Sequence, residues 1–140
     1  MLYSLLDPVV HRPPVKPRLV TVVAESQQTL DTLCSYFERV GIAGNAAREL
    51  GDVSMLATDA TSLVLFPDGF ERLQVEAFVL ALRRARPSLL ILLVSSAPQH
   101  LGAALEPDGS SLPPLVLPRP AFGWTILDAI RERGLEPNAD

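Results

Sequence analysis

The run Leu89-Leu90-Ile91-Leu92-Leu93-Val94 decides the fold class, because six consecutive apolar residues leave neither side of a β-strand for water. Such a run is typical of a central strand in a parallel sheet that helices cover on both faces. It is too short to span a bilayer, which takes about 20 apolar residues. We therefore expect an α/β domain built around this strand.

The segment before this run predicts a second strand and a long helix. The apolar stretch 62–66 reads as a compact strand, and Pro67-Asp68-Gly69 stops it with typical turn chemistry. A helix is predicted from about Glu71 to Ala85, and Pro87 prevents its continuation. The arginines near its end, Arg83, Arg84 and Arg86, are interpreted as a solvated helix end rather than a nucleic-acid patch.

A strand followed by a helix is also predicted at the start of the α/β body. Residues 19–23 form a β-rich run that ends at Ala24, and Ser26 is a suitable N-cap for the helix that follows. Leu30, Leu33, Cys34 and Phe37 recur at helical spacing, so Cys34 is expected in the core. Gly41 is predicted to end this helix in the left-handed conformation.

Weaker elements complete five alternations of strand and helix, which predict a parallel sheet with helices on both faces, a three-layer αβα arrangement. They are a strand over 42–47, a short helix after Asp52 with Val53, Leu56 and Ala57, a short helix over 100–105, a loop over 107–111, a strand over 115–117 and a helix over 122–133. This organisation divides the chain into a Pro-rich arm (1–17), the α/β body (18–134) and a polar tail (135–140).

Composition excludes several classes of function. The 140 residues are 48% hydrophobic and carry a net charge of −4, with no clustered basic face for nucleic acid. One cysteine and two histidines supply neither a disulfide nor a spaced set of metal ligands. No signal peptide or membrane span is visible, so we expect a cytoplasmic protein without a cofactor, a metal or a membrane partner.

In sheets of this kind the functional crevice lies beyond the carboxyl ends of the strands. The candidate residues are therefore those that follow each strand. They are Ala24-Glu25-Ser26, Phe66-Pro67-Asp68, Ser95-Ser96 and Pro118-Arg119-Pro120.

These strand ends resemble the response-regulator receiver (CheY-like) family. The resemblance rests on VVAES at 22–26, FERVG at 37–41, LLVSS at 92–96 and PRP at 118–120, and it covers residues 18–134. It implies a flavodoxin-like fold with strand order 2-1-3-4-5. It also implies bacterial signal transduction.

The resemblance further implies a phosphorylation site that has lost its reactive centre. The pair of acidic residues that holds Mg²⁺ in the family falls on Ala24 and Glu25, so one carboxylate is missing. The position of the aspartate that accepts the phosphoryl group falls on Phe66 or Pro67. Without paired carboxylates and the metal, charge building up on the phosphoryl oxygens is not offset, so phosphotransfer in the usual manner is not expected.

Other parts of that site are kept or altered. Ser95 matches the family's Ser or Thr, whereas Arg119-Pro120 replaces Lys-Pro, and a guanidinium is a planar fork rather than a point charge. The family geometry implies a cis peptide before Pro120, with an ordinary trans bond as the alternative. Arg119 is also a candidate ion-pair partner for Glu25 or Asp68.

Asp68 has two interpretations. The favoured one is a turn aspartate whose side chain caps its own backbone in Pro-Asp-Gly. The other is a displaced phosphoryl acceptor.

Partner binding is the expected activity, and three residues are candidates for it: Trp124, Phe122 and His100. The family commonly uses the face made by its fourth helix, fifth strand and fifth helix, here about 100–131, to form homodimers or to bind other proteins. Trp124 is equally well explained as an interface anchor or as a cover for the sheet edge. The Pro-rich arm over 2–17 is a second docking segment, or else an unstructured leader.

We therefore expect a pseudo-receiver that signals through phosphorylation-independent protein contacts. The alternatives are a phosphorelay receiver modified at Asp68, or the regulatory part of a longer transcription regulator. An enzyme with its own substrate comes last, because no strand end gathers a nucleophile, a base and an oxyanion donor. Neither a G-x-G-x-x-G nor a P-loop sequence follows the first strand.

Overall fold

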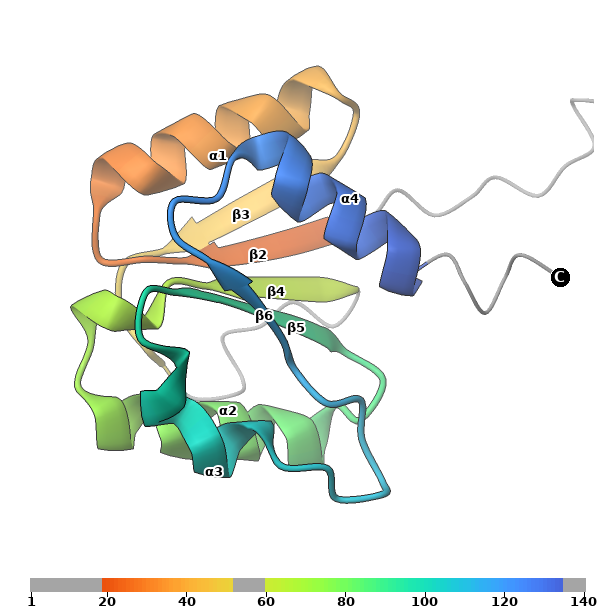
Figure 1. Cartoon of the computed structure of the whole chain (residues 1–140). Helices are drawn as coiled ribbons and strands as arrows, with labels where there is room; N and C mark the ends of the chain where they lie inside the picture. Colours follow the sequence, from red (N-terminus) through yellow and green to blue (C-terminus); the bar gives the residue numbers. More distant parts are fainter. Residues whose placement is uncertain (1–18, 52–59, 135–140) are drawn as a thin grey trace, which may run out of the picture.

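Five parallel strands form the middle of three layers in the computed structural model, which describes residues 19–51 and 60–134 (Figure 1). The strands are β2 (Leu19–Val23), β3 (Ala43–Ala47), β4 (Ser62–Leu65), β5 (Leu90–Ser95) and β6 (Leu115–Pro118). Their spatial order is β3-β2-β4-β5-β6. Counted along the chain this is 2-1-3-4-5, so the predicted flavodoxin-like sheet is confirmed.

Helices cover both faces of the sheet, as Figure 1 shows. One face carries α1 (Gln27–Arg39) and α4 (Gly123–Gly134), and the other carries α2 (Arg72–Ala85) and α3 (Gly102–Leu105). Two 3₁₀ turns, η3 (Pro67–Gly69) and η4 (Pro98–Leu101), follow β4 and β5. Within the described residues, no helix is both long and apolar enough to cross a membrane.

The position of β5 inside the sheet explains why the run 89–94 is apolar throughout. All six of its residues are buried, between β4 on one side and β6 on the other. Leu90, Leu92 and Val94 pack with the core under α1 and α4, whereas Ile91 and Leu93 pack with the core under α2. The strand begins and ends one residue later than predicted from the sequence.

The first strand and helix form as expected. The Ser26 side chain accepts a hydrogen bond from the Thr29 N–H at 3.3 Å, which caps α1. Gly41 ends the helix at a φ of 85°, which glycine adopts without the penalty of a Cβ. The buried Thr21 donates to the Asn45 side chain at 2.8 Å, so this polar residue is satisfied across the β2–β3 pair.

Two predicted elements differ from expectation or fall outside the described residues. The helix predicted over 100–105 is a 3₁₀ turn, η4, followed by the four-residue α3. The short helix predicted after Asp52 lies outside the described residues.

Arg83 is not a solvated residue, and that part of the sequence prediction is wrong. Its side chain is only 2% exposed. It donates hydrogen bonds to the carbonyls of Ala104 and Glu106 at 3.0 and 2.7 Å, and to the Ser111 hydroxyl at 3.0 Å. Its Nη2 lacks a hydrogen bond but lies 3.5 Å from an Asp108 carboxylate oxygen, so the remaining edge of the guanidinium is partnered by charge.

Asp108 organises the loop that Arg83 holds. It accepts hydrogen bonds from the N–H groups of Ser110 and Ser111, each at 2.9 Å. These backbone hydrogen bonds are the main reason why the pKa of Asp108 falls to about 2, and Arg83 adds to the effect. Gly109 supports the turn with a φ of 76°. The segment therefore has a defined shape without helix or strand.

The start of α4 approaches α1 closely because residue 123 is a glycine. A Cβ built on Gly123 would lie 2.6 Å from Cδ2 of Tyr36 and 2.8 Å from its Cγ. The absence of a side chain therefore sets the spacing between the two helices.

Replacing Arg83 by alanine is expected to lower the free energy of unfolding by about 2–3 kcal/mol, because buried carbonyls lose charged donors. Urea unfolding followed by circular dichroism measures the change. The matched control is Arg84→Ala, an exposed neighbour whose replacement should change stability by less than about 0.5 kcal/mol. Equal effects at the two positions would contradict the buried role of Arg83.

Replacing Gly123 by alanine is expected to destabilise the protein by about 1–3 kcal/mol, because the added methyl group overlaps the Tyr36 ring. The control is Gly102→Ala, whose added Cβ has no atom within 4 Å. Alanine there should be neutral or stabilising by about 0.5–1 kcal/mol. Thermal unfolding of both variants tests the difference, and a neutral Gly123→Ala would show that Tyr36 moves aside freely.

Candidate functional site

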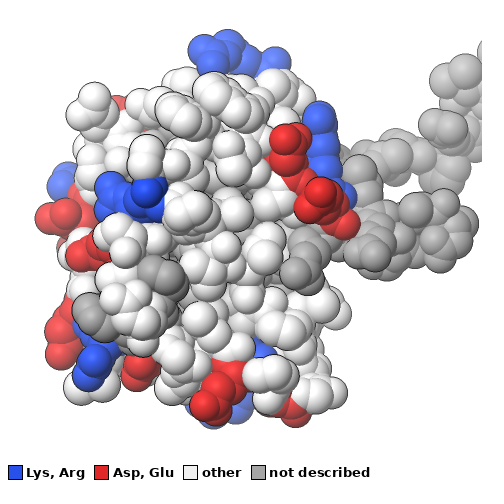
Figure 2. Space-filling view, in the orientation of Figure 1, with Lys and Arg blue, Asp and Glu red and all other residues white. Residues whose placement is uncertain are grey.

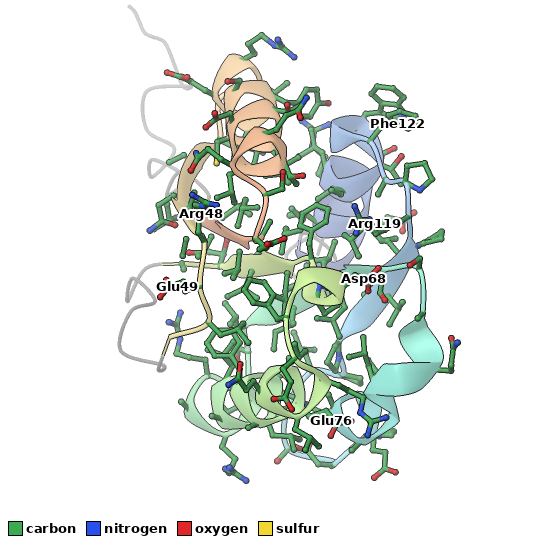
Figure 3. All side chains as sticks on the ribbon, turned by 90° about the vertical axis from the view of Figure 1, so that its left-hand side faces the viewer. Arg48, Glu49, Asp68, Glu76, Arg119 and Phe122 are labelled. Carbon is green, nitrogen blue, oxygen red and sulfur yellow. The ribbon has the colours of Figure 1, made fainter. Side chains whose placement is uncertain are left out.

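The candidate crevice lies at the edge of the sheet where the parallel strands end, which faces the viewer in Figure 3. Ser95 is the last residue of β5 and is fully buried. It pairs in register with Pro118 at the end of β6, which places Arg119 just beyond. Asp68 comes from η3, which directly follows β4 and Phe66. Three strand ends therefore bring Asp68, Ser95 and Arg119 together.

Asp68 is held from several directions. One carboxylate oxygen accepts a hydrogen bond from the Ser95 hydroxyl at 2.7 Å. The other accepts from the Ser96 N–H at 3.0 Å and from the Ser96 hydroxyl at 2.8 Å. Arg119 Nη1 lies 3.5 Å from that second oxygen. The Asp68 side chain is 24% exposed, so the cluster remains open to solvent on one side.

These partners keep Asp68 ionised. Partial burial alone would raise the pKa of its carboxyl group, but the hydrogen bonds from Ser95 and Ser96 and the charge of Arg119 outweigh it. The net effect is a pKa below the ordinary value for aspartate. A carboxylate with this many donors is stabilised as an anion.

Three sequence interpretations are decided by this geometry. The favoured view of Asp68, a turn aspartate that caps its own backbone, is wrong: its hydrogen bonds go to residues 27 and 28 positions further along the chain. Of the two partners considered for Arg119, the structure shows Asp68. The peptide between Arg119 and Pro120 is cis, as the family geometry implied.

The positions that carry acidic residues in receivers are differently occupied. Ala24, which directly follows β2, is buried, and Glu25 beside it is exposed. Phe66 is also buried and belongs to the core under α1 and α4, so it offers no acceptor group. Pro67, the other residue considered for that position, is buried in η3.

The residues present do not fit a magnesium site of the receiver type. A second carboxylate beside Glu25 is missing, and the part of the chain that the structure describes has no group of three or more His, Cys, Asp or Glu side chains that could hold a metal ion. The Asp68 oxygens already accept from Ser95 and Ser96. Glu25 instead packs closely against η3, where a Cβ on Gly69 would lie 2.8 Å from the Glu25 Cβ.

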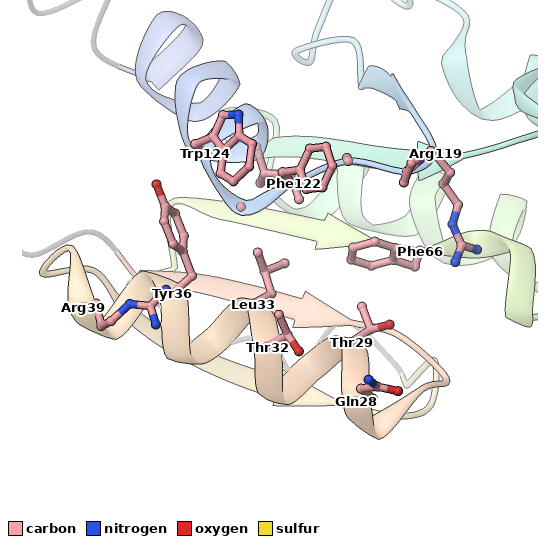
Figure 4. Close-up of a pocket in the computed structure, with 14 residues that line it drawn as sticks. Gln28, Thr29, Thr32, Leu33, Tyr36, Arg39, Phe66, Arg119, Phe122 and Trp124 are labelled. Atoms are coloured by element: carbon pink, nitrogen blue, oxygen red, sulfur yellow. The ribbon is translucent and has the colours of Figure 1, made fainter.

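A groove runs from this crevice along α1, between α1 and the start of α4 (Figure 4). Its volume is about 410 Å³. Arg119 and Phe66 lie at one end, and Tyr36 and Arg39 lie at the other. Leu33 of α1 faces it between the two ends.

Phe122 and Trp124 form the rim of this groove. Their rings stack with centroids 4.6 Å apart and planes 6° apart. They are 54% and 57% exposed, so Trp124 does not cover the sheet edge, which was one of its two interpretations. Two stacked and exposed aromatic rings suit the other interpretation, an anchor for a second surface.

The remaining candidates contribute less. His100 lies in η4, and its backbone alone is described. Cys34 is partly buried against the core, and burial, with the nearby charge of Asp31, raises the pKa of its thiol. A raised thiol pKa disfavours the reactive thiolate.

Sequence reasoning missed the part played by Ser96, which holds the Asp68 carboxylate with both its backbone and its side chain. Its position one residue after a buried strand was the available signal. The groove was also missed, although the spacing of Phe122 and Trp124 around a glycine indicated that both rings could share one side of the chain.

Comparison with known proteins identifies the fold but no family. No protein-family model matches the sequence, and no curated protein matches it. Among solved structures, the signal receiver domain of an HD domain-containing protein from Pseudomonas fluorescens is similar, with a TM-score of 0.67 and 14% identity over 89% of this chain and 100% of that one. A response regulator receiver domain protein (CheY-like) from Methanospirillum hungatei has a TM-score of 0.64 and 15% identity over 84% of this chain and 94% of that one.

A structure described as adenylate cyclase from Rhodopirellula baltica is also similar, with a TM-score of 0.66 and 12% identity over 84% of this chain and 87% of that one. At such low identities these similarities establish a shared fold. The chain therefore has the fold of receiver domains.

Replacing Asp68 by asparagine is expected to lower the free energy of unfolding by about 1–2 kcal/mol near neutral pH, because charged hydrogen bonds are lost at a partly exposed site. The pKa of Asp68 is lowered in the folded protein. Its contribution is therefore complete above the unfolded pKa of about 4 and is lost as the pH falls through the lower folded value. The gap between wild type and variant should shrink below about pH 4 in urea titrations.

The control for this experiment is Asp128→Asn, an exposed carboxylate on α4, with an expected effect under about 0.5 kcal/mol. A gap between wild type and Asp68→Asn that stays constant over the whole pH range would contradict the role given to the Asp68 charge.

Proposed function

We propose that this chain is a pseudo-receiver domain of bacterial signal transduction, which acts through phosphorylation-independent contacts with other proteins. Its fold, shared with receiver domains, supports the signalling role. The occupied crevice supports independence from phosphate. In this proposal the domain has no catalytic activity of its own.

The observation that carries the proposal is the position of the Asp68 carboxylate. Ser95, Ser96 and Arg119 offer a hydroxyl, an N–H group and a guanidinium, which are the kinds of group that bind phosphoryl oxygens. All three already face Asp68. The carboxylate thus supplies from within the chain the negative charge that a phosphoryl group would bring from outside, and the crevice stays in one arrangement.

The crevice lacks the receiver-type groups that hold the metal and accept the phosphoryl group. Transfer to a carboxylate needs a divalent cation to offset charge between acceptor and phosphate. Ala24 replaces one of the two acidic residues, and buried Phe66 stands where the acceptor would be. These replacements support a domain that does not carry out phosphotransfer.

The proposed partner surface is the face made by α3, β6 and α4, within residues 100–131. Figure 2 shows this face with the charged side chains gathered at its margins and few at its centre. An uncharged centre with a charged rim is the usual composition of a protein interface. Phe122 and Trp124 are the candidate anchors, and the partner is a second copy of the chain or another protein.

A phosphorelay receiver modified at Asp68 is the second candidate. The observation in its favour is that Asp68 is partly exposed and lies beside Ser95 and Arg119, the residues that would bind a phosphoryl group. Against it, both carboxylate oxygens already accept hydrogen bonds, and the lowered pKa of Asp68 makes the group a weaker nucleophile.

A phosphorylation experiment distinguishes the pseudo-receiver from the phosphorelay receiver. We expect no gain of one phosphoryl mass when the full chain is incubated with acetyl phosphate and Mg²⁺. We also expect no displacement of the Ser95, Ser96 and Arg119 amide signals by beryllofluoride, which mimics a phosphoryl group. The control is Asp68→Asn. A mass gain or amide shifts that vanish in Asp68→Asn would establish the phosphorelay alternative instead.

A further inference from the structure

The groove between α1 and α4 has a mixed lining: Gln28 and Thr29 of α1 lie toward its Arg119 end, and aromatic rings open to solvent lie toward its Arg39 end. Leu33, Tyr36, Phe122 and Trp124 line it, and the last two are more than half exposed. It extends along α1 from Gln28 to Arg39, which at 1.5 Å per residue is about 17 Å. A groove of this length suits an extended segment of about five or six residues.

The N-terminal part of the chain arrives at one end of this groove. Leu19, the first residue of β2, pairs in register with Ala43, which follows α1 by only a few residues. Because α1 runs opposite to β2, its last residue, Arg39, lies at the edge of the sheet where β2 begins. Leu19, the first described residue, therefore lies toward the Arg39 end of the groove.

The first ten residues, MLYSLLDPVV, are apolar enough that burial of their side chains against another surface is favourable. Most are apolar, and Asp7 is their one charged side chain. Leaving Leu2, Tyr3, Leu5 and Leu6 in water is unfavourable when an apolar surface is within reach. The basic residues of the arm come later, at Arg12, Lys16 and Arg18.

From these observations we infer that Leu2–Asp7 lies extended in the α1–α4 groove, with its apolar side chains against Phe122 and Trp124 and with Asp7 near Arg39. This arrangement makes the arm an internal cover for the aromatic rim. The inference does not rest on the state of Asp68, but it shares Phe122 and Trp124 with the proposed partner surface, so a partner anchored on these rings would displace the arm.

Length and charge both favour this occupant. Six extended residues span about 20 Å, close to the length of the groove, and the eleven residues 8–18 reach about 35 Å, more than enough to connect it to β2. The charged residues that line the groove are Arg39 and Arg119, with no carboxylate. A segment whose single charge is Asp7 complements them, whereas Arg12 and Lys16 fall in the connection outside the groove.

Trp124 reports on the groove directly, because it is the only tryptophan of the chain. One face of its indole already stacks on Phe122, so a segment in the groove would cover part of the remaining surface. We expect the acrylamide quenching constant of Trp124 to rise about twofold, with a red shift of its emission, when residues 1–10 are deleted. The full chain is the reference.

Two further variants keep the chain at full length. Leu5→Asp with Leu6→Asp should expose Trp124 as the deletion does, because burying carboxylates against the aromatic rings of the groove is unfavourable. Leu73→Asp is the matched control: Leu73 is 60% exposed on α2, on the opposite face of the sheet, and should leave Trp124 unchanged. Circular dichroism verifies that each variant is folded.

Three outcomes decide the inference. Exposure of Trp124 in the deletion and in the double variant, at every protein concentration, supports the arm as the cover. Identical quenching in the full chain, the deletion and the double variant overturns it. Shielding of Trp124 that is lost on dilution overturns it as well, because it identifies a second copy of the chain as the occupant.

Discussion

The burial of β5 on both faces constrains the rest of the molecule. A strand with no polar side chain until Ser95 must be covered by helices above and below, and its backbone must pair on both sides. Burying each leucine or isoleucine side chain is worth about 1.5–3 kcal/mol, so this strand is also a main source of stability. Along β5 the first polar side chain is Ser95, at the edge where the strands end. At that edge Ser95 meets Asp68 and Arg119.

The sequence predicted the elements that depend on local signals, and it did not predict the hydrogen bonds of Arg83 and Asp68 with distant segments. Continuous apolar runs and caps are local signals, so β5 followed from residues 89–94, and α1 followed from Ser26 and the helical spacing after it. The strand order followed from the resemblance to receivers. Arg83 and Asp68 could not be understood locally, because their partners lie 21 to 28 positions away in the chain. A helix-end arginine usually faces water, and a Pro-Asp-Gly aspartate usually caps its turn. In both cases a distant segment replaced the usual local partner.

A crevice lies at the strand ends of the sheet, and a groove lies beside it along α1. The crevice is polar and internally neutralised, with the Asp68 carboxylate set against Arg119. The groove beside it has a mixed lining, and its aromatic rim is open in the described part of the chain. Phosphotransfer at such a surface would require open ligands for a metal and a free acceptor, whereas binding requires complementary shape and apolar area. The distribution of polar groups is therefore consistent with the proposed binding role.

The contacts of Arg83 have a consequence for how the molecule opens. Residues 104–111 contain little regular structure, and a segment of that kind ordinarily fluctuates away from a domain at small cost in free energy. Here a buried guanidinium on α2 binds the carbonyls of Ala104 and Glu106 and the hydroxyl of Ser111. Detaching the segment would break these charge-assisted hydrogen bonds and separate Arg83 from Asp108. Opening of residues 104–111 should therefore cost more free energy than opening of a loop without such contacts, and it is tied to the end of α2 that carries Arg83.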